Sequence, residues 1–402
     1  MSEPTVFTTG NKARILIVSS SYAPVVGGVQ TVAHNLAKQL IGCGHEVRVV
    51  THRYPVSLPA QETIDGISVD RLLFLSPGFD YLRRPDLFGA SLFYGPQSHS
   101  KLKKVMQDFR PDVVNVHFPN HQIPFILKLR REFAFYLVVS LHGHDVERLD
   151  PAQGSENGDE RVSNKARVQL ESILREADAI TACSRHILDK ASQIEASVAG
   201  KGHVIYNGVD LERFSNKARY AHPRPYVLAF GRLTHKKGFD LLLRAFAEAG
   251  STNSSVDLII AGAGEERDQL KSLTGELGLD QKVHFFGEAS PDQIVQLLNG
   301  SLFVAVPSRR EPFGIVALEA LAAGKALLAS DTDGLGEFLS EIREPNVTLV
   351  EPTAAGLTDG LRKLLVSKGN GSSGASNQLP EQYSWANVAK RYEHVLIGSG
   401  RS

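Results

Sequence analysis

Short runs of apolar residues recur along the chain and alternate with longer segments whose apolar residues follow a helical spacing. Such runs are typical of strands that are buried on both faces of a parallel sheet. The alternation predicts an α/β fold built from doubly wound sheets. Strands are expected at residues 14–19, 46–51, 113–117, 137–141, 179–183, 203–206, 226–231, 257–261, 283–287, 302–306 and 326–329, and helices at residues 30–40, 239–249, 315–323 and 385–397.

The length of 402 residues exceeds that of one ordinary hydrophobic core and predicts about two domains. Asn207 to Asp210 follow the last expected strand of the first half. The next segment, residues 211–224, is polar and contains proline, so we interpret it as a linker. The expected domains are a Rossmann-like domain at 1–210, a second one at 225–383, and a C-terminal helical segment at 384–402.

Composition and charge narrow the class of protein. Hydrophobic residues make up 42% and charged residues 22%, as in globular proteins, and the net charge is zero. Residues 1–135 contain 15 Lys and Arg against 10 Asp and Glu, and the remainder contains 29 against 34. This balance argues against nucleic-acid binding but permits an anionic surface as a partner of the first third. Cys43 and Cys183 lie far apart in the sequence, which favours a reducing compartment.

A membrane contact is one interpretation of residues 81–104, where basic side chains are interleaved with aromatic ones. The alternative, which we favour, is the wall of an acceptor pocket followed by an ordinary solvated helix. No apolar signal segment begins the sequence, and no run approaches the roughly 20 apolar residues that span a bilayer. We therefore expect a cytoplasmic protein, with any membrane association peripheral and at the inner face.

The most informative chemistry lies between the expected strands at 302–306 and 326–329. A tight loop at residues 312–314 leads into an Ala- and Leu-rich helix, whose first N–H groups and positive dipole end favour an anion. Glu311 precedes this helix and Glu319 lies one turn into it. Carboxylates are good acceptors for hydroxyl groups, so the pair suits a ligand with a diphosphate and sugars. Alternatively, Glu311 is a capping acid and Glu319 a solvated residue.

Cations follow the expected strand at 226–231. Arg232 and Lys237 precede the next helix, at a spacing that lets both converge on a diphosphate, although surface cations are common. In the first half, His142 ends the strand at 137–141, at the edge where α/β sheets bind ligands. Gly27 and Gly28 precede the first helix, where glycine lets the backbone approach a ligand.

Several of these motifs resemble one family. The segment from Glu311 to Glu319 resembles the E-x7-E signature of retaining glycosyltransferases with the GT-B fold, and its flanks resemble glycosyltransferase family 4. The resemblance covers nearly the whole chain. It implies two Rossmann-like domains that face a cleft, with a C-terminal helix that crosses back to the first domain. The other motifs that carry it are Pro24-x-x-Gly27-Gly28-Val29, His142-Gly-x-Asp145, Asn207-Gly-Val-Asp210 and Pro307-Ser308.

The resemblance implies transfer of a sugar from a UDP- or GDP-linked donor to a glycan, lipid-linked or small-molecule acceptor, as in polysaccharide biosynthesis. Neither a cofactor nor a metal is required. Arg232 and Lys237 are expected to stabilise the leaving diphosphate, and His142 to contact the transferred sugar. Glu311 is assigned to the sugar and Glu319 to the ribose. The remaining donor-binding residues are Gly28, Gly287, Phe313, Gly314, Ile315 and Val316, and the acceptor-binding residues are Gly27 and Gly28.

Two features qualify this assignment. Asp331-Thr-Asp333 resembles the metal-binding D-x-D motif of GT-A enzymes, but it follows the strand after the E-x7-E helix, so no metal is assigned to it. The family usually has Gly-Gly where this chain has Asp333-Gly334. The alternative functions are a non-catalytic nucleotide-sugar-binding or scaffold protein of the same fold and a sugar-nucleotide epimerase. A glycogen-type phosphorylase would need a pyridoxal lysine and a longer chain.

Overall fold

The computed structural model describes residues 12–25, 27–75, 85–149, 160–215, 218–250, 255–342, 345–369 and 379–397. The chain divides into two compact units. The first comprises Met1–Asn207 and Trp385–Ser402, and the second comprises Gly208–Ser384. Residues 211–224, expected as a linker, therefore group with the second unit.

An eight-stranded sheet forms the centre of the first unit, in the order β3-β4-β2-β1-β5-β6-β7-β8. All of its pairings are parallel except that of β3 with β4. The order from β4 to β7 is the doubly wound Rossmann order, with its switch point between β1 and β5. The strands are β1 (Arg14–Ser19), β2 (Glu46–His52), β3 (Gln61–Ile64), β4 (Ile67–Leu72), β5 (Val113–His117), β6 (Tyr136–Leu141), β7 (Ala179–Ala182) and β8 (Gly202–Val204).

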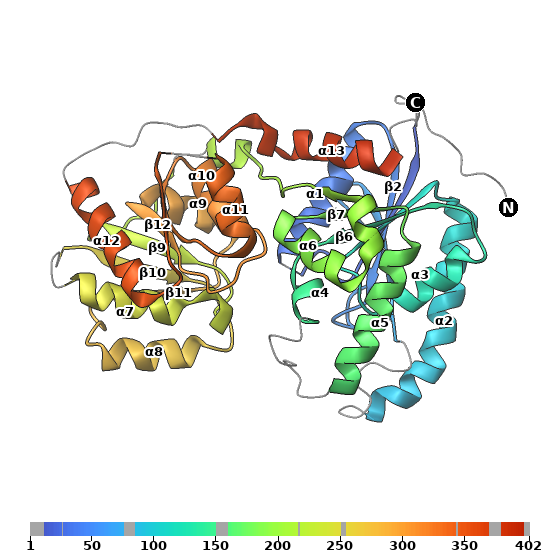
Figure 1. Cartoon of the computed structure of the whole chain (residues 1–402), viewed down its shortest axis with the longest axis horizontal. Helices are drawn as coiled ribbons and strands as arrows, with labels where there is room; N and C mark the ends of the chain where they lie inside the picture. Colours follow the sequence, from blue (N-terminus) through green and yellow to red (C-terminus); the bar gives the residue numbers. More distant parts are fainter. Residues whose placement is uncertain are drawn as a thin grey trace. The chain divides into compact units, whose positions relative to one another are not determined.

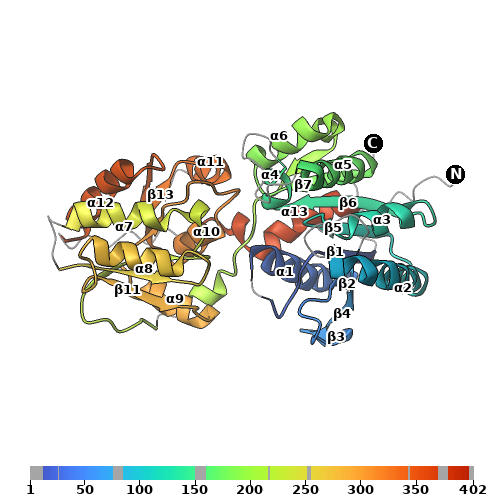
Figure 2. The same ribbon diagram turned by 90° about the horizontal axis from the view of Figure 1, so that it is seen from below.

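Helices connect these strands, and the last helix of the chain joins them. Helix α13 (Trp385–Ile397) packs on α1 (Gly28–Gly42) and on β5 and β6, as Figure 2 shows. Its buried face includes Trp385, Val388 and Tyr392. This spacing is typical of an amphipathic helix, which explains why the chain returns to the first unit. The other helices are α2 (Pro85–Phe109), α3 (Ile123–Arg130), α4 (His144–Glu147), α5 (Glu160–Glu176) and α6 (Arg185–Ile194), with a 3₁₀ turn, η2 (Ala196–Gly200).

The second unit has a six-stranded, fully parallel sheet in the order β11-β10-β9-β12-β13-β14. This is again the Rossmann order, and its switch point lies between β9 and β12. The strands are β9 (Tyr226–Phe230), β10 (Asp257–Ala261), β11 (Val283–Gly287), β12 (Phe303–Val306), β13 (Ala326–Ser330) and β14 (Val347–Val350).

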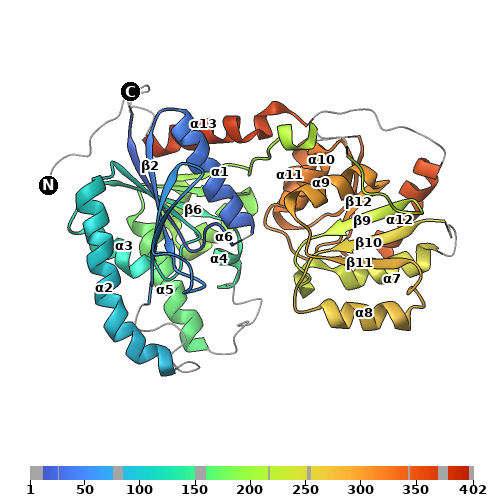
Figure 3. The same cartoon turned by 180° about the vertical axis from the view of Figure 1, so that it is seen from behind.

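Helices cover both faces of the second sheet. Figures 1 and 3 show α7 (Phe239–Gly250), α8 (Arg267–Glu276) and α12 (Ala354–Gly369) on one face. The opposite face carries α9 (Pro291–Gly300), α10 (Ile315–Ala322) and α11 (Asp333–Ile342). Alternate strand residues such as Val227, Ala229, Leu258 and Ile260 share one buried cluster with the leucines of α7 and α12. Short 3₁₀ turns complete the unit: η3 (Glu212–Ser215), η4 (His235–Lys237) and η5 (Glu381–Tyr383).

The predicted fold class is confirmed, and the expected strands and helices agree with the observed ones to within one or two residues at most ends. The sequence analysis did not delimit the hairpin of β3 and β4, of which β3 is polar and half exposed, nor β14. Among the helices it did not delimit α3, α4, α5, α6, α8, α9, α11 and α12. Residues 81–84, the first part of the segment considered for membrane contact, lie outside the described residues. Within the described residues, none of the helices combines the length and apolarity that crossing a membrane requires.

Candidate functional site

The loops at the carboxyl edge of the second sheet hold most of the predicted donor-binding residues. Backbone hydrogen bonds tie these loops together, because Gly231 N–H donates to Ala261 and Gly262 N–H donates to Gly287. Gly287, one of the expected donor-binding residues, thus ends β11 beside the loop that follows β10. In doubly wound folds this edge is where ligands bind.

Lys237 and Glu311 meet at this edge although they are far apart in the sequence. The Lys237 ammonium donates to Oε2 of Glu311, and both side chains are largely buried. Ser308 Oγ donates to the same carboxylate oxygen at 3.4 Å. Two residues that were singled out for different reasons, one for phosphate and one for sugar hydroxyls, therefore form a single ion pair.

The loops carrying these two residues are held in contact by the backbone and by a second ion pair. Gly238 has φ +66°, and a Cβ at this position would meet the Pro307 carbonyl oxygen at 2.1 Å, so only glycine fits. Arg309 pairs with Asp240 through two hydrogen bonds of 2.6 Å. Although burial alone would raise it, these bonds hold the pKa of Asp240 below its usual value. Arg309 is a positioning residue that no motif had indicated.

Helix α10 begins as the sequence predicted. Gly314 precedes it in the left-handed conformation with φ +94°, and a Cβ there would meet Leu335 at 2.6 Å. The carbonyl of Gly314 accepts from Ala317 and Leu318, and no side chain caps the helix. The first N–H groups of this eight-residue helix, those of Ile315 and Val316, thus precede the intrahelical bonds. An anion is the ligand that such a helix start favours.

Asp333 replaces the glycine that the family usually has, and its geometry shows how the change is accommodated. Its φ is +46°, in the left-handed region where Asp is tolerated better than most residues. The Asp333 carboxylate accepts a hydrogen bond of 3.1 Å from the Glu311 N–H. Thr332 donates to the carbonyl of Arg309 at 3.0 Å. The departure from the family pattern therefore supports the Glu311 loop.

Glu319 lies one turn into α10 and has a perturbed pKa. Crowding by protein atoms raises the pKa of Glu319 to about 7, while Arg213 acts in the opposite direction. The Arg213 guanidinium lies 3.9 Å from the Glu319 carboxylate, and 20% of the Glu319 side chain is exposed. Arg213, from η3, is another residue that the sequence analysis did not single out.

Arg232 follows β9 and is exposed to solvent. Among the residues that the structure describes, no acid forms an ion pair with its guanidinium. A cation without an internal counter-ion at the ligand-binding edge is available to an anionic ligand.

The carboxyl edge of the first sheet holds His142 in a chain of hydrogen bonds. His142 Nε2 lies 3.0 Å from His117 Nδ1, and His117 Nε2 lies 2.5 Å from Asn115 Oδ1. The two imidazole rings are stacked with centroids 5.2 Å apart. His117 ends β5 and is fully buried, and Asn115 is buried on the same strand.

This chain of bonds determines the tautomers of both histidines. Asn115 donates through Nδ2 to Ser140 Oγ at 2.9 Å, so its Oδ1 is the acceptor that faces His117. His117 therefore carries its proton on Nε2, and its Nδ1 accepts from the Nε2–H of His142. Burial lowers the pKa of His142 to about 4 and the pKa of His117 well below its ordinary value, so both rings are neutral at pH 7.

Asp145 supports the backbone at His142. Its carboxylate accepts from the N–H groups of His142 at 3.1 Å and Gly143 at 2.8 Å. Burial raises the pKa of Asp145 to about 6, while these hydrogen bonds act in the opposite direction. Asp145 thus shapes the turn between β6 and α4 and orients His142.

The glycine pair of the first unit lies where the sequence placed it. Gly27 precedes α1 with extended backbone, and Gly28 is the first residue of this helix. Thr31 donates to the carbonyl of Gly27 at 3.0 Å. Val26 lies outside the described residues, so the path of the loop between β1 and α1 is described only on either side of it.

Comparisons with known proteins agree with this architecture. Residues 26–213 match the family described as Glycosyltransferase Family 4, and residues 210–378 match the family described as Glycosyl transferases group 1. An uncharacterised glycosyltransferase of Methanocaldococcus jannaschii is 30% identical, covering 95% of this chain and 97% of its own. Glycogen synthase of Mycobacterium tuberculosis is 28% identical, covering 96% of this chain and 95% of its own.

Solved structures share the fold over the whole chain. Sucrose-phosphate synthase from Thermosynechococcus elongatus has a TM-score of 0.75 at 20% identity, covering 96% of this chain and 98% of its own. HepE of Anabaena in complex with UDP and glucose has a TM-score of 0.67 at 20% identity, covering 96% and 99%. The chain belongs to glycosyltransferase family 4 and has the GT-B fold.

Proposed function

We propose that this protein is a retaining glycosyltransferase that moves a hexosyl group from a nucleoside diphosphate to an acceptor hydroxyl. The observation that carries the proposal is the Lys237–Glu311 ion pair beside the start of α10, at the carboxyl edge of the second sheet. A cation and an anion in contact, next to free helix N–H groups, suit a ligand that joins a diphosphate to a polyhydroxylated sugar.

The donor is assigned to the second unit. Arg232 and Lys237 bind the diphosphate together with the N–H groups at the start of α10, where negative charge grows as the donor bond breaks. Glu311 accepts hydroxyls of the sugar and Glu319 those of the ribose. Gly287 leaves room for the base. We propose UDP- or GDP-sugars as donors, and UDP is the first to test because HepE of Anabaena, which shares this fold, was solved with UDP and glucose.

The Lys237–Glu311 ion pair also indicates which contacts change when the donor binds. Each of the two ions satisfies the other. Phosphate oxygens offer Lys237 a stronger partner, and sugar hydroxyls offer Glu311 new donors. Donor binding thus replaces one internal ion pair with two sets of contacts to the ligand. These contacts offset the free-energy cost of removing Lys237 and Glu311 from water.

The first unit is assigned to the acceptor and to His142. A neutral His142 with its Nε2–H held by His117 keeps a fixed ring orientation toward the transferred sugar. The acceptor, near Gly27 and Gly28, is a glycan, a lipid-linked glycan or a small molecule with a free hydroxyl. In the transfer the bond from the sugar C1 to the phosphate oxygen breaks, and a bond from C1 to the acceptor oxygen forms on the same face. The acceptor proton passes to the departing diphosphate.

Charge stabilisation in this proposal comes from Arg232, Lys237 and the helix dipole, so the reaction needs no divalent metal. The activity is expected to persist in EDTA. A loss of activity in EDTA that Mg²⁺ or Mn²⁺ restores would contradict this part of the proposal.

The experiment that tests the function is a screen of UDP- and GDP-sugars for hydrolysis and transfer. Wild-type protein and the Lys237→Ala variant are compared, and the anomeric configuration of the product is followed by NMR. Release of UDP or GDP by the wild type only, with retention at C1, supports the proposal. Binding without turnover of any donor would favour the non-catalytic alternative, and a product epimerised in the sugar ring would favour the epimerase.

A further inference from the structure

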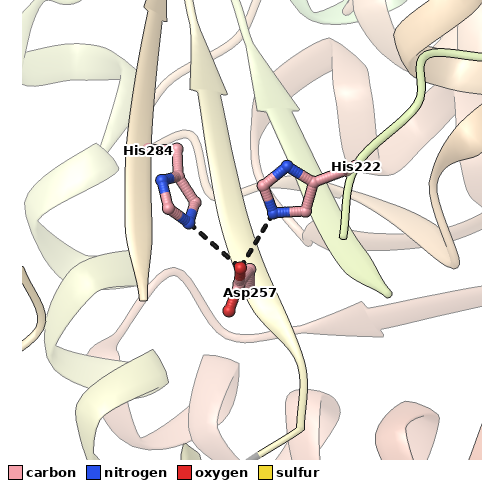
Figure 4. Close-up of side chains that lie close together, drawn as sticks. All are labelled: His222, Asp257 and His284. Atoms are coloured by element: carbon pink, nitrogen blue, oxygen red, sulfur yellow. Dashed lines mark hydrogen bonds and ion pairs between the residues drawn. The ribbon is translucent and has the colours of Figure 1, made fainter. Parts of the chain in front are cut away.

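A second cluster of polar side chains lies at the opposite edge of the second sheet from the donor loops. Asp257 is the first residue of β10 and is fully buried, and His284 lies near the start of β11. His222 belongs to the segment that leads into β9. Figure 4 shows both imidazoles pointing at the same carboxylate from either side.

The two histidines converge on a single oxygen atom. His222 Nε2 lies 2.8 Å and His284 Nε2 lies 3.0 Å from Oδ2 of Asp257. All of the candidate ligand atoms lie within 4.8 Å of one another. Two ligand atoms bound about 2.1 Å from one metal ion at angles between 90° and the tetrahedral value are about 2.9–3.4 Å apart. The 3.0 Å spacing of His284 falls within this range, and the 2.8 Å spacing of His222 lies just below it.

From this geometry we propose that His222, Asp257 and His284 form a binding site for a divalent transition metal, with Zn²⁺ as the preferred ion. Two imidazole nitrogens and one carboxylate oxygen are a ligand set that zinc uses in proteins. The metal takes the place of the Nε2 protons, and each neutral imidazole then carries its proton on Nδ1. Water completes the coordination, because 40% of the His284 side chain is exposed while only 9% of His222 is.

Arg224 also contacts the carboxylate of Asp257. Its Nε lies 2.9 Å from Oδ1 of Asp257 and 3.0 Å from Oδ2. The Arg224 Nε–H donates to Oδ2, and with zinc on that oxygen it shifts to Oδ1, which lies 2.9 Å away and accepts no hydrogen bond among the described residues.

The position of the site indicates a structural role. Asp257 and the end of β10 are four residues apart, which corresponds to roughly 13 Å along a strand. The metal is thus remote from Arg232, Lys237 and the start of α10, and the proposal does not depend on the proposed function. It joins three segments that are distant in sequence, namely the approach to β9, β10 and β11. Binding to the folded chain alone raises its stability.

The test compares zinc binding by the full chain and by three variants after removal of metals with EDTA. Zinc affinity is measured by competition with a chromophoric chelator at neutral pH. His284→Ala and His222→Ala each remove one ligand. His34→Ala is the matched control, because His34 Nε2 also lies 3.0 Å from a carboxylate, that of Asp65, but without a second imidazole.

We expect one zinc ion per chain, an affinity at least roughly tenfold weaker in both cluster variants, and no change in His34→Ala. Stoichiometric zinc should raise the melting temperature of the wild type but not of His284→Ala. If His222→Ala fails to fold, the half-exposed His284→Ala decides the result by itself. Absence of tight binding, or equal affinity in wild type and His284→Ala, would overturn the proposal and leave the cluster as an ion-pair network.

Discussion

The carboxyl edges of the two sheets have the same topology but opposite chemistry. At the edge of the first sheet, His117 and His142 are neutral and sequestered, and a chain of hydrogen bonds fixes them. At the edge of the second sheet, Lys237 and Glu311 form an ion pair and Arg232 is exposed. Both edges lie at the switch point of a Rossmann-type sheet.

The comparison shows what each kind of site is suited to do. The hydrogen-bond network of Asn115, His117 and His142 fixes the orientation of the His142 ring. Its groups are neutral and its protons are already donated to acceptors, so the network offers a ligand no charge. An ion pair next to a free helix start offers charge and can exchange partners. We therefore expect changes at the cations of the second unit to alter binding of the nucleotide, and changes in the first unit to alter turnover alone.

The largest effect is expected for Glu311→Gln. Removal of the carboxylate charge should lower transfer at least roughly 100-fold, because the sugar loses a charged acceptor and one of its two oxygens becomes a donor. UDP should bind as well as before or better, since Lys237 loses its internal partner. Initial rates and calorimetry with UDP measure the two quantities. A parallel fall in rate and UDP affinity would place Glu311 on the nucleotide instead.

Lys237→Ala is expected to weaken UDP or GDP binding by roughly 1.5–3 kcal/mol, or about 10- to 160-fold, as for loss of a hydrogen bond to a charged group. Calorimetry with the same nucleotides measures this. The neighbouring Lys236→Ala is the matched control in the same turn, and His142→Ala is the control in the first unit. Neither control should change nucleotide affinity, and unchanged affinity in Lys237→Ala would refute the assignment.

A smaller effect is expected for His117→Ala, at roughly tenfold in turnover with unchanged donor affinity, because His142 loses the acceptor that fixes its tautomer. The ¹⁵N shifts of the His142 ring report this directly, and should change from a single tautomer to a mixture. His121→Ala, which alters another histidine with a pKa of about 4, serves as the control. An unchanged His142 tautomer in His117→Ala would show that the hydrogen bond does not determine it.

The smallest effect concerns pH. The pKa of Glu319 is raised to about 7, and ribose hydroxyls prefer the ionised carboxylate, so donor affinity should rise a few-fold between pH 6 and 8. The folded chain also holds this proton over the window from about 4.5 to 7, where the unfolded chain has released it. Glu319 therefore makes stability fall as pH rises through that window. In Glu319→Gln both pH dependences should flatten, and a steep dependence that persists would point to another group.

Much of the fold could be predicted from hydrophobic periodicity and turn residues. Part of the candidate site could be predicted from two glutamates at a fixed spacing. Because strands buried on both faces are mostly apolar, β1, β5 and β10 could be delimited to the residue. The amphipathic pattern of 385–397 likewise predicted α13. Local signals of this kind depend only on neighbours in the chain. The fold class and the ends of the delimited strands and helices could therefore be predicted from the sequence.

The pairings between distant residues were decided by tertiary structure alone. Nothing near Arg309 indicates Asp240, and nothing near His117 indicates His142 or Asn115, because each partner is contributed by a different loop or strand. The same holds for the perturbed pKa of Glu319, which reflects packing, and for His222 and His284, which are 62 residues apart in the sequence and meet only at Asp257. Sequence patterns specify elements, whereas the order of strands in the sheet decides which side chains meet at its edges.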